Sequence, residues 1–244
     1  MPAAPAPVPS LMRRLAAEFL GTGLLVTVVV GSGIAAQNLS PHDVGLELLE
    51  NSTATVFGLT VLILLFGPVS GAHFNPVVSV ADWFVGRSSR TGLSLADAGA
   101  YIVAQVTGAV AGALLANSMF AVPFGLSARD RLTGGHLIGE VVATAGLLAL
   151  IFSLARSRRA ALSAPAVGAY IGAAYWFTSS TSFANPAVTV GRIFSDTFTG
   201  ISPGSTPGYI AAQVLGAAIG VAVVLFLYPD AAESAADVVV PHAG

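Results

Sequence analysis

Long apolar stretches recur along the chain, and short polar segments separate them. A helix needs about 20 predominantly apolar residues to cross roughly 30 Å of hydrocarbon. Stretches that approach this length occupy residues 11–37, 49–66, 95–120, 137–155, 164–180 and 209–228. The pattern predicts six transmembrane helices, and therefore an all-α membrane protein.

The composition agrees with a location in lipid. The 244 residues are 55% hydrophobic and 9% charged, with a mean hydropathy of +0.80, whereas soluble domains average about 45–50% apolar and 25% charged residues. The net charge of −2 and the lack of a basic tract argue against nucleic-acid binding, which needs a concentrated positive patch. Because the chain has no cysteine, we exclude disulfides, thiolate nucleophiles and cysteine-ligated metals, and we expect no metal or cofactor.

The two ends of the chain differ from the stretches between them. The first apolar stretch is too long for the core of a signal peptide, which has about 7–15 residues, so we interpret it as the first span. Residues 1–10 and 230–244 are rich in Ala, Pro or polar residues and cannot bury a core. Both are predicted to be flexible tails.

All ten positive residues are arginines, and their distribution predicts the orientation in the membrane. Cytoplasmic loops of membrane proteins carry an excess of Lys and Arg. Seven arginines fall on one side of the predicted spans and three on the other: Arg13, Arg14, Arg87, Arg90, Arg156, Arg158 and Arg159 against Arg129, Arg131 and Arg192. We expect both tails to be cytoplasmic, the protein to lie in the inner (plasma) membrane, and residues 121–136 to form an extracellular loop.

The two halves of the sequence resemble each other. Residues 101–108 (YIVAQVTG) and 209–216 (YIAAQVLG) share six of eight positions, and a second pair of matching segments begins at Asn75 and Asn185. Glu18 and Glu140 form a third matching pair in the same order. Each unit, residues 11–120 and 137–229, holds three spans, so the second must enter the membrane from the opposite side. The sequence predicts an inverted repeat, with a site near the midplane where the units meet.

Each Asn-Pro pair is predicted to start a short helix. Asn is a strong N-cap, and Pro is favoured at the first helical position. About ten residues follow each pair before a polar break, and ten helical residues span only about 15 Å. Two such half-helices entering from opposite faces would meet halfway through the bilayer.

The segments before these half-helices are candidates for pore lining. Non-helical backbone at membrane depth is tolerated where protein buries it or where it lines a water-filled cavity. The carbonyls of residues 71–74 and 181–184 would supply acceptors, and the amides of Asn75 and Asn185 would supply donors. Two helix N-termini also focus partial positive charge on the junction, which repels cations. The arrangement predicts a pore for small neutral solutes.

The segments at residues 70–76 (SGAHFNP) and 184–187 (ANPA) resemble the two signature loops of the aquaporin and aquaglyceroporin family. The resemblance implies a right-handed bundle of six transmembrane helices with two re-entrant half-helices, assembled as a homotetramer with one pore per subunit. The residues that match the two motifs are Asn75, Pro76 and Val77 in the first and Asn185, Pro186 and Ala187 in the second.

The resemblance also implies roles for three polar side chains. Glu18 and Glu140 match buried glutamates that accept hydrogen bonds from the pore loops in this family. The alternative is a protonated carboxyl or one paired with an Arg, since an ionised group in mid-membrane is costly. His73 matches a histidine at the cytoplasmic pore mouth, and the alternative is a loop histidine that the backbone satisfies.

The outer constriction departs from the family pattern. Val188 occupies the position of an Arg that normally narrows the pore, and Phe57 and Ser182 match two further filter positions. For the fourth position the sequence leaves Ala173, Tyr175 and Trp176 open, and Tyr175 is our candidate. Arg192, one helical turn beyond Val188, either reaches the outer vestibule or pairs with Asp196 or a lipid phosphate.

A filter without its Arg is wider and more apolar, and the pattern resembles bacterial family members associated with arsenic resistance. The sequence therefore predicts a passive channel for glycerol-like polyols, arsenite and other metalloid hydroxides, and water. The alternative is a secondary transporter, because those also use inverted repeats. Two symmetric acids suit a scaffold better than a proton relay. An enzyme is not expected, since the spans hold no nucleophile with a base and no metal-ligand cluster.

Overall fold

A computed structural model describes residues 9–87 and 91–228. The helices are α1 (Leu11–Leu39), α2 (Val44–Ser70), α3 (Pro76–Gly86), α4 (Leu95–Met119), α5 (Gly134–Arg156), α6 (Ser163–Phe177), α7 (Pro186–Gly191) and α8 (Thr206–Leu227), with single 3₁₀ turns η1 (Ala160–Leu162) and η2 (Arg192–Phe194). The described residues contain no strand. This confirms the predicted all-α membrane fold. The predicted tails, residues 1–10 and 230–244, lie outside the described residues except for residues 9 and 10, and so does Arg90.

Five helices, α1, α2, α4, α5 and α8, are long and apolar enough to cross a membrane alone. The fifth predicted span, residues 164–180, is shorter than its apolar stretch, because α6 has 15 residues and covers only about 22 Å. It ends at Phe177, after which Thr178 turns its hydroxyl back to the carbonyl of Ala174 at 2.7 Å. Residues 178–180 therefore belong to the loop that leads to α7, and their inclusion in the fifth span was wrong.

Two other boundaries differ from the prediction for local reasons. The second span begins at Val44, because Asp43 caps α2 by accepting a hydrogen bond from the Leu46 amide at 2.9 Å. The second half-helix is shorter than the ten residues predicted, since α7 has only six residues and continues as the turn η2. The first, α3, has 11 residues and agrees with the prediction.

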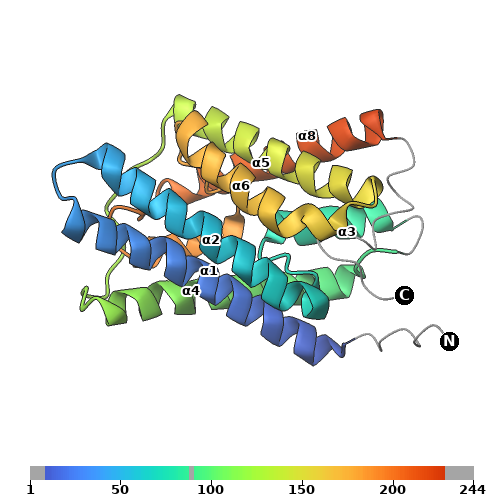
Figure 1. The fold of residues 1–244 in the computed structure, drawn as a ribbon, viewed down its shortest axis with the longest axis horizontal. Coiled ribbons are helices and arrows are strands. Elements are labelled where there is room, and N and C mark those ends of the chain that lie inside the picture. The colour runs from blue at the N-terminus through green and yellow to red at the C-terminus, as the bar shows by residue number, and fades with distance from the viewer. Residues whose placement is uncertain (1–8, 88–90, 229–244) are drawn as a thin grey trace.

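The repeat is visible in the packing of the helices. In Figure 1, α1, α2 and α4 lie below α5, α6 and α8, with α2 next to α6 in the middle. Within each group the first helix packs against the third, α1 on α4 and α5 on α8, and also against the second. Helix α1 begins and α8 ends at the same end of the molecule, on the right in Figure 1.

Glycines allow these helix pairs to approach closely. A Cβ atom on Gly112 of α4 would collide with the carbonyl oxygen of Gly23 in α1, and one on Gly220 of α8 would collide with the carbonyl oxygen of Ala145 in α5. At the first contact, Thr27 also donates a hydrogen bond to the Gly112 carbonyl at 3.0 Å. Small residues at such crossings allow van der Waals contact between backbones in lipid.

This packing predicts opposite outcomes for two glycines of α4. Gly112→Ala should lower the thermal unfolding midpoint in detergent by several degrees, because overpacking a tight contact costs about 1–3 kcal/mol. Gly99→Ala is the control, since a Cβ there meets nothing within 4 Å, and alanine favours the helix by up to about 1 kcal/mol. Equal midpoints for the two variants, measured by size-exclusion chromatography after heating, would contradict the close contact.

Candidate pore

The two Asn-Pro turns meet in the interior of the molecule. The Asn75 side-chain oxygen caps α3 by accepting from the Val77 amide at 3.1 Å, and the Asn185 oxygen caps α7 by accepting from the Ala187 amide at 2.9 Å. Each side-chain nitrogen crosses to the other half: Asn75 donates to the Ala184 carbonyl at 2.8 Å, and Asn185 to the Phe74 carbonyl at 2.7 Å. The half-helices therefore point their N-termini at one junction. An amide nitrogen carries two N–H groups, and each crossing bond uses one of them.

The loop before α3 is held by Glu18 of α1. One carboxylate oxygen accepts from the Ser70 hydroxyl at 2.6 Å and the His73 amide at 3.0 Å, and the other accepts from the Phe74 amide at 2.7 Å and the Gln105 side chain at 2.8 Å. Glu18 is fully buried, and the single ion pair among the described residues does not include it. Its geometry is that of a hydrogen-bond acceptor for the loop.

Glu140 of α5 holds the second loop in the same way. Its oxygens accept from the amides of Phe183 and Ala184, both at 2.9 Å, and from the Gln213 side chain at 2.6 Å. It is also fully buried. The two acids are thus equivalent in position and in bonding.

These hydrogen bonds compensate for an uncommon backbone conformation. Ala72 and Phe74 have φ of 50° and 49°, and the residues at the equivalent positions of the second loop, Ser182 and Ala184, have φ of 51° and 49°. Positive φ is uncommon for residues other than glycine and stores strain that the surroundings must offset. The loops hold this shape because buried carboxylates bind their amides.

A narrow cavity of about 60 Å³ runs past the junction. Its polar side is formed by the loop residues and the two Asn side chains, and its apolar side by two residues from each of four helices. Those apolar residues are Leu25 and Val29 of α1, Leu59 and Ile63 of α2, Leu147 and Ile151 of α5, and Val167 and Ile171 of α6. The first and third pairs are equivalent in the repeat, as are the second and fourth. A path with one polar and one apolar side suits a small molecule that has both kinds of surface.

His73 lines this cavity on the side of the first loop. Its Nδ1 lies 3.0 Å from the Ser79 hydroxyl, and its ring meets Tyr101 edge-on with centroids 5.5 Å apart. The structure therefore places His73 in the cavity lining, which is the first of the two alternatives, and its ring contacts the side chains of Ser79 and Tyr101. In the second half, Phe183 stands at the equivalent position, 5.1 Å from Tyr209.

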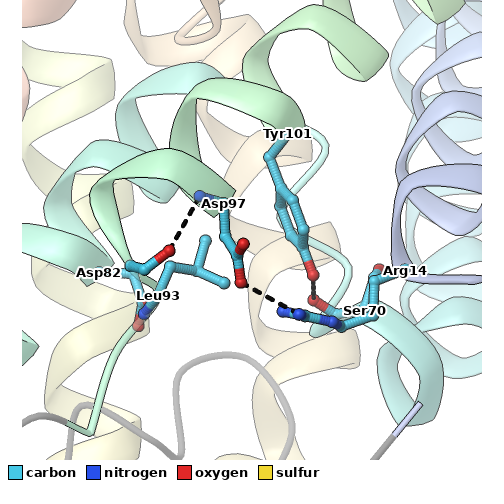
Figure 2. A network of polar contacts seen from close by, with 7 residues as sticks. Arg14, Ser70, Asp82, Leu93, Asp97 and Tyr101 are labelled. Atoms are coloured by element: carbon cyan, nitrogen blue, oxygen red, sulfur yellow. Dashed lines mark hydrogen bonds and ion pairs between the residues drawn. The ribbon is translucent and has the colours of Figure 1, made fainter. Parts of the chain in front are cut away.

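Polar contacts link helix α4 to both α1 and α2 (Figure 2). The Tyr101 hydroxyl donates to the carbonyl of Ser70, the last residue of α2, at 3.0 Å. Arg14 of α1 forms an ion pair with Asp97 of α4 at 3.0 Å. These contacts position the loop that carries His73.

Three of the four predicted filter residues line the cavity: Ser182, Val188 and Tyr175. The prediction for Phe57 is wrong. Its side chain is 67% exposed and does not line the cavity, because the buried face of α2 runs through Thr55 and Leu59, and a residue two positions from each points to the opposite side of a helix with 3.6 residues per turn. Thr55 lines the cavity instead.

The structure also separates the alternatives for the fourth filter position. Tyr175 is buried and its hydroxyl lies 3.2 Å from that of Thr55. Ala173 is exposed, and Trp176 is 52% exposed with its indole donating to Ser52 at 3.2 Å. Of the three, Tyr175 is the one that reaches the cavity.

Arg192 reaches the outer end of the cavity. It is 2% exposed, its Nε donates to the Thr199 carbonyl, and its guanidinium carbon lies 3.4 Å from the centroid of the Phe183 ring. Asp196 does not pair with it, but accepts from the hydroxyl of Ser127 at 3.3 Å and from the amide of Ala128 at 3.0 Å. The arginine that follows Val188 by one turn thus brings a positive charge to the vestibule.

A second arginine, Arg131, also lies beside Phe183, and the sequence did not predict it as a site residue. Arg131 donates to the carbonyls of Gly200 at 2.7 Å and Phe198 at 2.9 Å, and its guanidinium carbon lies 5.3 Å from the Phe183 ring centroid. Burial lowers the pKa of Arg131 to about 10, so it stays charged at neutral pH. Its charge placed it in the extracellular loop, but no local pattern indicated that the loop folds back over Phe183.

Membrane-spanning helices surround two half-helices, whose N-termini meet beside the cavity. This arrangement defines a multi-pass membrane protein of the channel class. Residues 7–182 match the model of the family described as major intrinsic protein. The chain belongs to the major intrinsic protein family.

Three known proteins of this kind resemble the chain, two of them over about nine tenths of its length and one over about half. It is 48% identical over 222 residues to the aquaglyceroporin AqpS of Rhizobium meliloti (strain 1021), covering 91% of this chain and 92% of that protein. It is 39% identical over 120 residues to the glycerol uptake facilitator protein of Pseudomonas aeruginosa, covering 49% of this chain and 40% of that protein. The X-ray structure of the aquaglyceroporin from Plasmodium falciparum aligns with a TM-score of 0.62 at 22% identity, covering 90% of this chain and 96% of that one, which shows the shared fold.

The bonding of the first loop predicts the effect of Glu18→Gln. The glutamine nitrogen would face loop donors that now meet an oxygen, such as the Phe74 amide, and each buried donor left without a partner costs about 1–3 kcal/mol. The unfolding midpoint should fall by several degrees, and solute flux through proteoliposomes should drop. Glu50→Gln, at a partly exposed acid that accepts from Ser40, should change neither. A Glu18→Gln variant as stable and active as the parent would refute the scaffold role.

Proposed function

We propose that the protein is a passive channel for small uncharged solutes, with glycerol-like polyols, arsenite and other metalloid hydroxides, and water as substrates. The observation that carries the proposal is the junction in which Asn75 and Asn185 each donate to the other half of the molecule. Two helix N-termini at one point contribute roughly half a positive charge each. A cation that loses its hydration there is repelled, whereas a hydroxyl finds donors and acceptors.

The residues at the outer end of the cavity favour the passage of solutes larger than water. The position that carries an Arg in the family pattern is Val188. The next arginine, Arg192, lines the cavity one helical turn further along, with its guanidinium on Phe183 and its Nε donating to the Thr199 carbonyl. The constriction keeps hydrogen-bonding groups at Ser182 and Tyr175 beside an apolar side chain at Val188. Glycerol and undissociated arsenite both present hydroxyls on a small neutral body, which fits this mixture.

The relatives support the same solute class. One is called an aquaglyceroporin and another a glycerol uptake facilitator. The alternative, a secondary transporter, needs a group that binds a coupling ion. Glu18 and Glu140 are the buried acids nearest the junction, and their oxygens are occupied by loop and glutamine donors. A channel is favoured.

We further propose that the protein works as a homotetramer in the inner membrane, with both termini cytoplasmic. The arginine distribution supports this orientation, and α1 begins at the end of the molecule where α8 ends (Figure 1). The outward face of α2 is rich in large apolar side chains, Phe57, Val61, Leu64 and Leu65. Such a face suits contact with lipid or with a neighbouring subunit.

Flux measurements on purified protein in liposomes test the proposed activity. Stopped-flow light scattering should show glycerol and arsenite entering faster than in empty vesicles, with rates that are linear in solute concentration and insensitive to a pH gradient. Passage of water alone would refute the wide constriction. Saturating flux that follows the proton gradient would instead favour a transporter.

Substitutions in the vestibule test the role of Arg192. Arg192→Gln should lower glycerol and arsenite flux several-fold and change water flux less, because it removes the guanidinium donors at the cavity entrance. Arg159→Gln, an exposed arginine away from the cavity, is the matched control. Val188→Arg should depress the flux of both larger solutes more than that of water. If Arg192→Gln behaved like Arg159→Gln for all three solutes, Arg192 would have no part in selection.

A further inference from the structure

An apolar groove lies between α3 and α8, separate from the pore. It has a volume of about 550 Å³, and every residue that lines it is apolar. Pro76 and Pro186, the prolines of the two Asn-Pro turns, line one end of it. Phe84, in the last turn of α3, lines it as well, so the groove follows α3 from the junction toward the opposite end of that half-helix.

A difference between the two halves of the repeat explains the groove. In the second half, a Cβ on Gly191 would lie 2.7 Å from the carbonyl oxygen of Ala109, so α7 packs directly against the backbone of α4. The equivalent residues in the first half are Ala81 on α3 and Ala217 on α8. Both carry a methyl group and both line the groove. Ala81 carries the methyl group that Gly191 lacks, and α3 contacts α8 less closely than α7 contacts α4.

The dimensions and polarity of the groove match one leaflet of a bilayer. The 11 residues of α3 span about 16 Å, close to half of the roughly 30 Å hydrocarbon core. Arg87 directly follows α3 on the side assigned to the cytoplasm. Its exposed guanidinium lies over Phe84, with its central carbon 3.9 Å from the ring centroid. A cation therefore stands at the aqueous end of an apolar slot.

We propose that this groove binds an anionic phospholipid of the cytoplasmic leaflet, with one acyl chain between α3 and α8 and the head-group phosphate on Arg87. The charge complementarity at Arg87 selects a lipid over an uncharged apolar partner, and anionic lipids are abundant in that leaflet. Because the chain end would contact Pro76 and Pro186, the bound lipid stabilises the turns that form the junction. The proposal does not depend on which solute the pore conducts.

Native mass spectrometry and thermal unfolding of the full chain in detergent test the site. Phosphatidylglycerol should give a retained adduct on each subunit and raise the unfolding midpoint, more than phosphatidylcholine with the same acyl chains does. Arg87→Gln should reduce the preference for phosphatidylglycerol several-fold, whereas Arg159→Gln should preserve it. Equal preference in the two variants would overturn the head-group assignment.

A pair of substitutions on α8 tests the acyl-chain position. Ala218→Phe, at an exposed position that lines the groove, should abolish the adduct and its stabilisation. Ala211→Phe, exposed on the same helix but outside the groove, should not. Adducts that survive Ala218→Phe while the oligomeric state changes would show that another subunit covers the groove, and the proposal would be wrong. Competition by inorganic phosphate that removes all stabilisation would reduce the site to a phosphate site and would also overturn it. Should Ala218→Phe fail to fold, the two Arg variants still decide.

Discussion

The structure depends on hydrogen bonds to the backbone of the two loops that are not helical at membrane depth. No water is available in hydrocarbon to bind free amides and carbonyls, so irregular backbone survives there only when protein or a wet cavity satisfies it. Glu18 and Glu140 bind the amides of the two loops, and the Asn side chains bind two of the carbonyls. The amides of Ala72 and Ser182 bind the hydroxyls of Ser70 and Ser180 at 3.1 Å and 3.2 Å, and both loops line the cavity. A pore exists because the acids leave carbonyls, and not amides, available to a solute.

The inverted repeat forms this arrangement twice, and the two copies carry different residues at the two ends of the cavity. His73 in the first loop is replaced by Phe183 in the second, so one end of the cavity has an imidazole and the other a ring that stacks with Arg192. The seventh residue after each Asn is buried and charged in both halves, but Asp82 accepts a hydrogen bond from the Leu93 amide at 2.7 Å (Figure 2), whereas Arg192 reaches the cavity. The symmetric positions carry the scaffold, and the asymmetric ones give each mouth its own chemistry.

Much of the site was predictable because the repeat marks it. The two Asn-Pro pairs and the two acids stand at matched positions, and each brings local chemistry that a sequence displays directly: an N-cap, a proline at the first helical position, an acid in an apolar stretch. His73 was predicted from the family resemblance, since Phe183 stands at its matched position. The prediction for Phe57 was wrong because matching a motif identifies the helix that holds a residue, but not the direction in which its side chain points from the helix axis. The buried polar face through Asn51, Ser52 and Thr55 is the signal that would have pointed to Thr55. Arg131 had no such signal, because its position depends on a loop that folds back over Phe183.

By itself the sequence determined the class of the protein, the number of crossings, the inversion of the repeat and the two turns that meet. These follow from length, hydropathy and local capping, which act within a few residues of chain. Tertiary structure alone decided which face of α2 lines the cavity, that Tyr175 and not Trp176 reaches it, and that Arg192 lies on Phe183 rather than beside Asp196. It also decided that α3 contacts α8 less closely than α7 contacts α4. These features depend on contacts between residues far apart in the chain, where a single methyl group or one helical turn changes which atoms meet.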